Sequence, residues 1–306
     1  MKISIIIPML NELKNVNILF ERIISTIKKR KEVFEIIVVD DGSNQDVIPE
    51  YKKVKELYED YKINFLLLNK SYGHQKALET GIKNSTGDYI LTMDGDLQDP
   101  PEVIDQLMDN ISASDLDVVG TKRTRRRTAV WKKVMISFFY KLVNLFTVKK
   151  VEQNAGDFRI AKRKVYDYIF STIKPYYFFR FEISNSDFLI KYIDYEQQDR
   201  INEKAKSKLD WYIDFASQAF ISSSHGFIKK LFYFFCLSFI ILILIFFMHI
   251  LLKFSPLSFD NSLTILLITL LGFNGVILLN LICFEFISYK ILQSSNLSIN
   301  LPFKKL

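Results

Sequence analysis

Two long apolar stretches near the carboxyl end set the strongest limit on what this chain can fold into. Residues 231–252 are apolar apart from Ser238 and His249, and residues 263–284 contain no charged side chain. Each stretch is long enough to cross the hydrocarbon layer of a bilayer, about 30 Å, as one helix. The remaining sequence is too short to bury both as core helices, so the pattern predicts two transmembrane helices that form a hairpin.

Lysine residues flank this predicted hairpin at both of its outer ends, whereas the segment between the stretches carries few charges. By the positive-inside rule, the lysine-bearing ends stay in the cytoplasm. We therefore expect a protein integral to the cell (inner) membrane, with two spans and both termini cytoplasmic. The chain begins Met-Lys and continues into an apolar run, so we expect no secretory signal peptide. The flanking lysines are Lys229, Lys230, Lys290, Lys304 and Lys305.

Length, charge and cysteine content narrow the class of protein further. With 306 residues, the chain has room for one α/β domain of about two hundred residues beside the hairpin. Its formal net charge of +7 suits contact with anionic lipid and a phosphate-bearing substrate, and we expect no nucleic-acid partner. Cys236 and Cys283 lie inside the apolar stretches, which argues against a disulfide framework.

The first 120 residues alternate short apolar runs with longer polar stretches. Runs that are nearly continuous in Ile, Val and Leu are typical of parallel strands buried on both faces. Their alternation with helices predicts an α/β fold with a Rossmann-like, mostly parallel sheet that binds ligands at the carboxyl ends of its strands. The expected strands are Ile3–Ile7, Glu35–Val39, Asn64–Leu68, Tyr89–Met93 and Asp117–Val119, and the expected helices are Leu13–Lys29, Val47–Tyr61, Gln75–Asn84 and Pro101–Asn110.

Polar residues follow four of these runs, where a binding crevice is expected. After the fourth run the chain reads Asp94-Gly95-Asp96, and two carboxylates this close repel each other without a positive partner. Mg²⁺ or Mn²⁺ meets that need and keeps room for substrate phosphates. An ordinary turn is the alternative for this triplet alone. The sequence has no Gly-x-Gly-x-x-Gly after the first run and no Walker loop, which argues against the common dinucleotide and P-loop sites.

The chain changes character from about residue 121. A basic run at 122–127 precedes apolar residues at helical spacing over 129–146, which fit either a helix in the membrane interface or a helix packed on the sheet. A second such stretch, 211–227, leads into the first span and is expected to be interfacial. The expected organisation is a cytoplasmic domain at 1–210, an interfacial amphipathic helix at 211–229, two transmembrane helices (about 231–252 and 263–284) within 230–290, and a cytoplasmic tail at 291–306.

Six short motifs carry a resemblance to a known family. In chain order they are Ile6-Ile7-Pro8 with Asn11-Glu12, Val38–Ser43, Gly73-His74-Gln75, Gly87-Asp88, Asp94–Glu102 and Gly156–Arg159. By the order and spacing of these motifs across residues 3–208, the chain resembles family 2 glycosyltransferases with the GT-A fold, of the polyprenyl-phosphate type. The strings Asp-Leu-Gln-Asp-Pro-Pro-Glu and Gly-Asp-Phe-Arg are the specific ones, and the two spans fit the bactoprenol enzymes.

The resemblance implies transfer of a hexose from a nucleotide sugar to a polyprenyl (undecaprenyl) phosphate for cell-envelope glycan assembly, with Mg²⁺ or Mn²⁺ as cofactor. It implies that Asp94 and Asp96 hold the metal, and that Asp96, Asp99 and Arg159 are catalytic. The lipid bilayer is a further expected partner, and the chain is compatible with a homo-oligomer. The residues implied to bind the substrates are Pro8, Asn11, Glu12, Asp40, Asp41, His74, Asp94, Gln98, Arg123, Arg125 and Lys208.

The sequence departs from the family pattern mainly in the half that is expected to meet the acceptor. Lys122 stands where relatives carry an arginine, no acidic residue closely precedes the Arg180-Phe181 pair, and the usual Gly-x-Ser-Lys-Tyr motif reads Ala205–Leu209. These changes leave two alternatives open: a non-catalytic relative that binds nucleotide or lipid as an assembly partner, and a transferase that acts on a lipid-linked saccharide. The Gln-x-x-Arg-Trp motif of processive relatives is absent, which argues against polymerisation.

Overall fold

The described residues of the chain fall into two compact units. A computed structural model describes residues 1–124, 152, 155–171, 177–184, 186–198, 232–250, 261–294 and 302–306. The first unit takes in residues 1–222 and 298–306, and the second residues 223–297. The predicted helix over 129–146, the interfacial stretch 211–227, Arg125 and Lys208 all lie outside the described residues.

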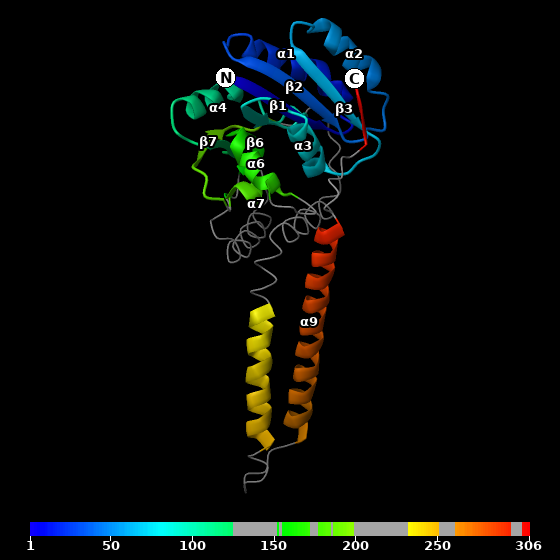
Figure 1. Cartoon of the computed structure of the whole chain (residues 1–306), viewed down its shortest axis with the longest axis vertical. Coiled ribbons are helices and arrows are strands. Elements are labelled where there is room, and N and C mark those ends of the chain that lie inside the picture. Colours follow the sequence, from blue (N-terminus) through cyan, green and yellow to red (C-terminus); the bar gives the residue numbers. More distant parts are fainter. Residues whose placement is uncertain are drawn as a thin grey trace. The chain divides into compact units, whose positions relative to one another are not determined.

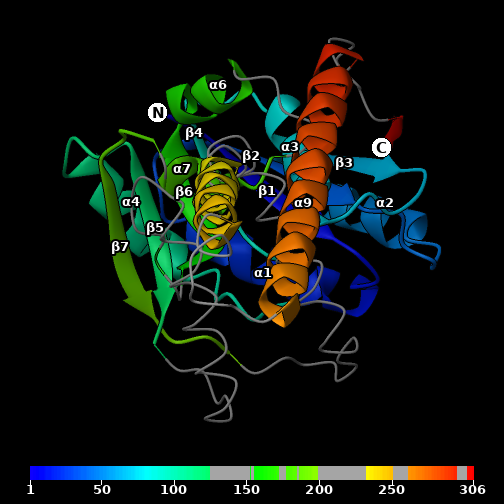
Figure 2. The ribbon, with the colours of Figure 1, turned by 90° about the horizontal axis from the view of Figure 1, so that it is seen from below.

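The first unit is built on one mixed eight-stranded sheet with the order β7-β5-β6-β4-β1-β2-β3-β8 (Figure 1). β3, β2, β1 and β4 run parallel, β6 runs antiparallel to both β4 and β5, and β7 runs parallel to β5. Figure 2 shows β7 at one side of this sheet and β3 towards the other. The strands are β1 Lys2–Met9, β2 Val33–Asp40, β3 Lys62–Leu68, β4 Tyr89–Thr92, β5 Val118–Arg123, β6 Ala155–Lys162, β7 Ile190–Tyr195 and β8 Phe303–Lys305.

Helices cover both faces of the sheet, because its central strands are apolar on both sides. In β1, every residue from Ile3 to Met9 is buried. One core cluster joins the sheet to α1, α2 and α4, and a second joins the opposite face to α3, α6 and α7. The helices are η1 Leu13–Asn15, α1 Val16–Ile27, α2 Ile48–Leu57, α3 His74–Lys83, α4 Val103–Ser112, α6 Arg163–Ser171 and α7 Phe179–Ser184.

The five strands and four helices expected in the first 120 residues are confirmed, as is the mostly parallel α/β fold. The sequence analysis did not anticipate β6, which inserts between β4 and β5. Because β6 is antiparallel to β4, its first residues lie at the carboxyl end of β4; Arg159 is the register partner of Thr92. The Gly-Asp-Phe-Arg motif therefore reaches the same edge of the sheet as Asp94.

The last residues of the chain also join this sheet, which the sequence analysis did not predict. β8 pairs antiparallel with β3, with Phe303 opposite Leu68 and Lys305 opposite Leu66. The backbone N–H of Leu306 donates to the carbonyl oxygen of Phe65 at 3.0 Å. The side chain of Leu306 packs against the first core cluster. The chain thus returns to its N-terminal sheet after both apolar helices.

The second unit contains two helices that are long and apolar enough to cross a membrane. Residues Phe232–Ile250 have a mean hydropathy of 2.6, and Leu263–Cys283, within α9 (Asn261–Ser294), have 2.4. Only 6% of each segment is buried within the protein, which is unlike a core helix. Polar pairs link the two helices: Nε2 of His249 lies 2.8 Å from Oγ1 of Thr264, and Nδ2 of Asn274 donates to Oγ of Ser238 at 2.6 Å. The two helices therefore pack as the predicted hairpin.

Candidate active site

Asp94 follows β4 and lies between two cationic side chains from other elements. Its Oδ1 is 3.6 Å from Nε2 of His74, the first residue of α3. Its Oδ2 is 4.0 Å from Nη2 of Arg123, the last residue of β5. The two oxygens of one carboxylate thus face opposite sides of the crevice, and Asp94 marks the point where β4, α3 and β5 meet.

Asp157, near the start of β6, joins β6 to α3 from a buried position. It pairs with Arg159, accepts a hydrogen bond from Nε2 of Gln75 at 3.0 Å, and lies 3.3 Å from Nε2 of His74. Burial opposes ionisation of this carboxyl, but Arg159 and the other donors hold the pKa of Asp157 far below its ordinary value. The charged carboxylate therefore organises the cations around it at neutral pH.

His74 faces two carboxylates, Asp94 and Asp157. Burial lowers the pKa of His74, but these two carboxylates outweigh it and raise the pKa to about 9. The imidazole then adds positive charge to the crevice at neutral pH. A divalent cation at Asp94 would reverse part of this effect, because it would repel the imidazolium.

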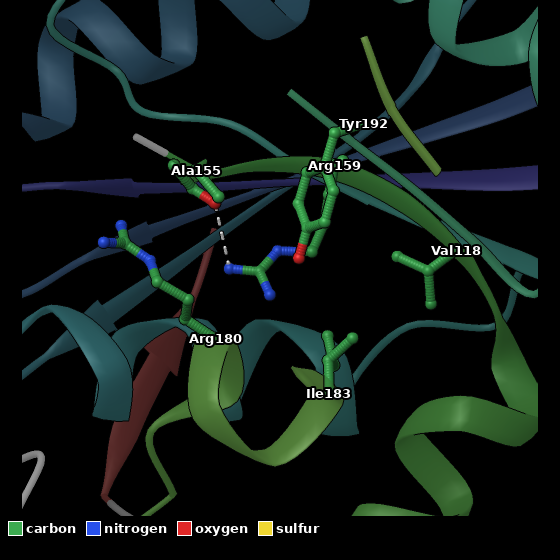
Figure 3. Close-up of a pocket in the computed structure, with 8 residues that line it drawn as sticks. Val118, Ala155, Arg159, Arg180, Ile183 and Tyr192 are labelled. Carbon is green, nitrogen blue, oxygen red and sulfur yellow. Dashed lines mark hydrogen bonds between the residues drawn. The ribbon is translucent and has the colours of Figure 1, made fainter. Parts of the chain in front are cut away.

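Arg159 and Arg180 line a pocket between the sheet and α7 (Figure 3). Arg159 is anchored, because its Nη2 donates to the carbonyl oxygen of Gly156 at 3.3 Å and also pairs with Oδ1 of Asp157. Arg180 lies 4.0 Å from Oδ2 of the same carboxylate. Two guanidinium groups beside one carboxylate leave an excess of positive charge, which suits an anionic group. The lining residues are Val118, Gly120, Ala155, Gly156, Arg159, Arg180, Ile183 and Tyr192.

Asp99 is fully buried on the other side of the crevice. Its Oδ1 accepts a hydrogen bond from the phenol of Tyr195, and Nη2 of Arg123 lies 3.5 Å from the same oxygen. Its Oδ2 has no hydrogen-bond partner among the described residues. Burial, and then the nearby charge of Asp94, raise the pKa of Asp99 to about 6. Asp99 therefore holds its proton to a higher pH than an exposed aspartate does.

The half-buried carboxylates of Asp94 and Asp96 are the groups that could hold a metal ion. Oδ1 of Asp96 accepts a hydrogen bond from the backbone N–H of Gln98 at 3.1 Å, which fixes the turn. Within the described part of the chain, no three His, Cys, Asp or Glu side chains converge on one point. Two carboxylate ligands with an open side fit an ion such as Mg²⁺, which takes its other ligands from water and substrate phosphates.

Two buried aspartates after β2 brace the loops beside the crevice. Asp40 accepts hydrogen bonds from Oγ of Ser43 at 2.8 Å and from the phenol of Tyr51 at 2.9 Å. Asp41 accepts from the backbone N–H groups of Tyr72 at 2.8 Å and Gly73 at 2.9 Å, and from Oγ of Ser71. Both carboxylates are thus engaged by the chain itself, in loops that form one wall of the crevice.

Gly42, between Asp41 and Ser43, cannot be replaced without moving the backbone. It has a φ of 73°, and a Cβ at this position would lie 2.4 Å from the carbonyl carbon of Lys70. The left-handed conformation and the close approach of the neighbouring loop both require glycine. This explains why the Asp-Asp-Gly-Ser motif carries glycine there.

The loop after β1 completes this wall. Pro8 lies within β1, opposite Val39 of β2. The backbone N–H of Asn11 donates to Oγ of Ser43 at 2.8 Å, and its side-chain oxygen accepts from the backbone N–H of Asn44 at 2.9 Å. Glu12 accepts a hydrogen bond from Nδ2 of Asn15 at 2.6 Å. The exposed Asn11 is therefore tied to the Asp40 loop, although these residues are far apart in the sequence.

The described candidate residues thus lie at one edge of the sheet. One group surrounds Asp94, and the other lies on the loops after β1 and β2. Gln98 is held by Gln197 and by the backbone N–H of Gln198, which donates to its carbonyl oxygen at 3.0 Å. Tyr195 was missed by sequence reasoning, whereas Gln75 appeared in the Gly73-His74-Gln75 motif and Arg180 in the Arg180-Phe181 pair, both without a role. Nothing in a local motif marks Tyr195, because its contacts depend on the pairing of β7 with β5.

The profile described as Glycosyl transferase family 2 matches residues 4–184. This range covers all the described strands except β7 and β8, and it includes every described candidate residue.

Among curated proteins, the chain is similar to an uncharacterized glycosyltransferase of Synechocystis sp., with 36% identity over 54% of this chain and 51% of that protein. It is also similar to an undecaprenyl-phosphate 4-deoxy-4-formamido-L-arabinose transferase of Photorhabdus laumondii, with 34% identity over 51% of this chain and 46% of that protein. The chain therefore spans about half the length of the curated relatives it matches.

Among solved structures, the chain is similar to a mannosyltransferase from Pyrobaculum calidifontis that was determined in complex with GDP-Man and Mn²⁺. The TM-score is 0.48 at 14% identity, over 72% of this chain and 62% of that one. Glucosyl-3-phosphoglycerate synthase from Mycobacterium tuberculosis, determined with UDP, has a TM-score of 0.46 at 17% identity, over 72% of this chain and 78% of that one.

Proposed function

The chain belongs to glycosyl transferase family 2, and from this premise we propose that it transfers a sugar from a nucleotide-sugar donor to a polyprenyl phosphate at a membrane. The observation that carries the proposal is the arrangement around Asp94, whose carboxylate lies between cations from two elements, His74 of α3 and Arg123 of β5. Such a site suits a reaction that brings two phosphate-bearing molecules together. The curated relatives that act on undecaprenyl phosphate support the choice of acceptor.

The reaction needs placement and charge control more than acid–base chemistry, because a lipid phosphate is already anionic at neutral pH. A phosphate oxygen of the acceptor attacks the anomeric carbon of the sugar. The bond from that carbon to the donor diphosphate breaks, and its electron pair leaves with the nucleoside diphosphate. Positive charge fixed in advance at both phosphate groups is the largest catalytic contribution that a protein can offer here.

Asp94 and Asp96 would hold a divalent ion, Mg²⁺ or Mn²⁺, which when bound neutralises the leaving diphosphate. On one side of Asp94, Arg159 and Arg180 would bind an anionic group of the substrates in the pocket beside Asp157. On the other side, Arg123 would face the diphosphate from the end of β5. A guanidinium group suits these roles because it can donate two parallel hydrogen bonds to a phosphate.

The loops after β1 and β2 would bind the nucleoside. The side chains of Asp40 and Asp41 hold these loops in place through internal hydrogen bonds. Asn11 is exposed in the same wall and is the polar side chain best placed to contact the nucleoside itself. Asp99 would orient the sugar from its buried position, and Arg125 and Lys208 remain proposed phosphate ligands on the family resemblance.

The two apolar helices would insert into the membrane and keep the enzyme beside its lipid acceptor. We place the sheet domain and both termini in the cytoplasm, where nucleotide sugars are made.

The proposal is tested with the purified full-length protein in lipid vesicles that contain undecaprenyl phosphate. The sample receives Mg²⁺ or Mn²⁺ and, one at a time, a panel of nucleotide sugars, and the lipids are analysed by mass spectrometry. We expect one donor to yield a lipid phosphate that is heavier by the mass of one sugar residue. If a nucleotide sugar binds but no donor in the panel gives a lipid product, the non-catalytic alternative is favoured. If a product forms only when a lipid-linked saccharide replaces undecaprenyl phosphate, a transferase that acts on lipid-linked saccharides is favoured.

A further inference from the structure

Tyr195, the last residue of β7, occupies a fixed place between two charged residues of the crevice. In the parallel pairing of β5 and β7, Tyr195 is the register partner of Arg123. The carbonyl oxygen of Tyr195 accepts two hydrogen bonds from Thr124, one from its backbone N–H at 3.0 Å and one from its side-chain Oγ1 at 3.1 Å. Its ring packs edge-on against Phe158, with centroids 6.0 Å apart, and only 5% of the residue is exposed. The phenol therefore has little freedom to point elsewhere.

The phenol hydroxyl of Tyr195 both accepts and donates a hydrogen bond. Its oxygen accepts a hydrogen bond from Nε of Arg123 at 3.0 Å, and its single proton is donated to Oδ1 of Asp99. Because Nε of Arg123 is taken by the phenol, the outer nitrogens of that guanidinium are turned towards the carboxylates. Nη2 lies 3.5 Å from Asp99 and 4.0 Å from Asp94. The hydrogen bond from Nε to the phenol oxygen is the shortest of these contacts and fixes the rotation of the guanidinium about its own stem, which the longer contacts to Asp99 and Asp94 alone would restrain less.

We propose that Tyr195 is a positioning residue, whose hydroxyl fixes the guanidinium of Arg123 between Asp99 and Asp94 so that it meets the donor diphosphate. The inference rests on the proposed function and adds a residue outside the motifs. Tyr195 touches neither substrate itself. Tyr195 acts through Arg123. Because the phenol proton is donated to Asp99, a lone pair of the phenol oxygen faces Arg123. Phenylalanine at this position would keep the ring packing on Phe158 and lose both hydrogen bonds.

The alternative is that Tyr195 merely braces the loop that carries Asp99. A double-mutant cycle separates the two cases, because residues that act through one another show non-additive effects. The cycle compares Tyr195→Phe, Arg123→Lys and the double variant in full-length protein, with kcat, KM for the nucleotide sugar and the melting temperature measured for each. Tyr168→Phe, at an exposed tyrosine of α6, controls for the substitution itself.

We expect Tyr195→Phe to lower kcat about tenfold in the otherwise unchanged protein, because the guanidinium is no longer held in a productive orientation. In the Arg123→Lys background, the same change should cost less than about twofold, because the group that Tyr195 positions is already altered. KM for the nucleotide sugar should change by less than about threefold.

Two results would overturn the assignment while leaving the proposed function intact. One is full activity of Tyr195→Phe in a wild-type protein that makes the glycolipid. The other is an equal fold-loss in both backgrounds with a matching loss of thermal stability, which indicates a brace only. If the wild-type protein makes no glycolipid, the proposed function itself has failed, and this outcome is distinct from the two results above, which reject the role of Tyr195 in a protein that does make the glycolipid.

Discussion

Single side chains decide the charge of this site, and Asp157 is the clearest example. Its two oxygens face different cations, with Arg159 at Oδ1 and with His74 and Arg180 at Oδ2. Removing either member of a buried ion pair leaves an unpaired charge, which typically costs about 3–5 kcal/mol. Arg159 can therefore serve both as a substrate ligand and as a partner that Asp157 needs for folding, and a mutation has to separate these roles.

For Arg159→Lys, we expect kcat/KM for glycolipid formation to fall by roughly ten- to a thousandfold, because the charge is kept but the two-pronged donor is lost. Nucleotide affinity should change little if the contact is to the lipid phosphate. Arg163→Lys is the matched control, since Arg163 donates to the carbonyl oxygen of Gly87 at the opposite edge of the sheet. That variant should lose thermal stability without losing turnover per folded molecule. Wild-type turnover in a folded Arg159→Ala protein would end the assignment.

Asp96→Asn tests the proposed metal ion. We expect metal-dependent turnover to disappear while the melting temperature changes by no more than a few degrees, because an amide cannot balance the cation and the residue lies on a half-exposed turn. Asp105→Asn serves as the control, because it removes another half-buried carboxylate, on α4 and outside the crevice. Full activity of the wild-type protein in chelator would contradict the metal assignment whatever the variant does.

The residues that local motifs could reveal are those on loops directly after the strands. Asp94, Asp96 and the Asp40–Asp41 pair fall in this group, because strand ends are visible as the end of an apolar run. Tyr195 could not be found in this way, because its contacts depend on the β5–β7 register, which no nearby residue indicates. Gln75 stood in the Gly73-His74-Gln75 motif, but its contact with Asp157 depends on the packing of α3 against β6.

At the scale of elements, the antiparallel insertion of β6 builds the second half of the crevice. A sheet made only of the five strands expected in the first 120 residues would have left the Gly-Asp-Phe-Arg motif unplaced. With β6 between β4 and β5, Asp157 and Arg159 project from one face of the strand towards α3 and α7. The motif was recognisable in the sequence, but the strand was not, because charged residues interrupt the apolar residues of Ala155–Lys162.

Glu35 of β2 ties strands together at the amino ends of the sheet, away from the crevice. It is buried, accepts a hydrogen bond from Oγ of Ser4 at 2.6 Å, and pairs with Nζ of Lys62 at 2.7 Å. Burial opposes its ionisation, but Lys62, Ser4 and Thr86 lower the pKa of Glu35 from 4.5 to about 2. A carboxyl whose pKa is lower in the folded state stabilises the fold above its ordinary pKa, and this contribution is lost as pH falls from about 4.5 towards 2.

We therefore expect the unfolding free energy of the wild-type protein to fall over this pH range, by an amount on the order of 2 kcal/mol from this residue. In Glu35→Gln, stability at pH 7 should be lower and the fall between pH 4.5 and 2 should be correspondingly smaller. Glu59→Gln, at an exposed glutamate after α2, serves as the control. Parallel pH curves for Glu35→Gln and wild type, followed by circular dichroism, would show that Glu35 does not carry this dependence.

The edge strand β8 ties the end of the chain to the sheet. Deleting residues 303–306 removes the pairing with β3 and the packing of Leu306 on the core. We expect a loss of about 1–3 kcal/mol in stability, because several hydrogen bonds and one apolar side chain are lost while the crevice is untouched. Melting and turnover of the deletion variant check this, with Lys304→Ala as a control that keeps the backbone pairing. An unchanged melting temperature would mean that β8 adds nothing to the sheet.

At the scale of the whole molecule, β8 constrains the membrane topology independently of the lysine pattern. The strands before the apolar helices and the strand after them belong to one sheet. If both helices cross the membrane, the chain crosses it an even number of times, so both termini must lie on the same side. The positive-inside rule reaches the same arrangement from charge alone and adds which side it is. Neither argument depends on the other.

Cysteine labelling in intact cells tests this arrangement. Ser258→Cys places a thiol in the segment between the two apolar helices, and Lys305→Cys places one in β8, in a background where Cys236 and Cys283 are replaced by alanine. If the sheet and β8 lie in the cytoplasm, as proposed, a membrane-impermeant maleimide should label only the Ser258→Cys protein from outside. After permeabilisation, the exposed side chain at position 305 should label as well. Labelling of both thiols, or of neither, before permeabilisation would contradict a two-span hairpin, and labelling of position 305 alone would reverse its orientation.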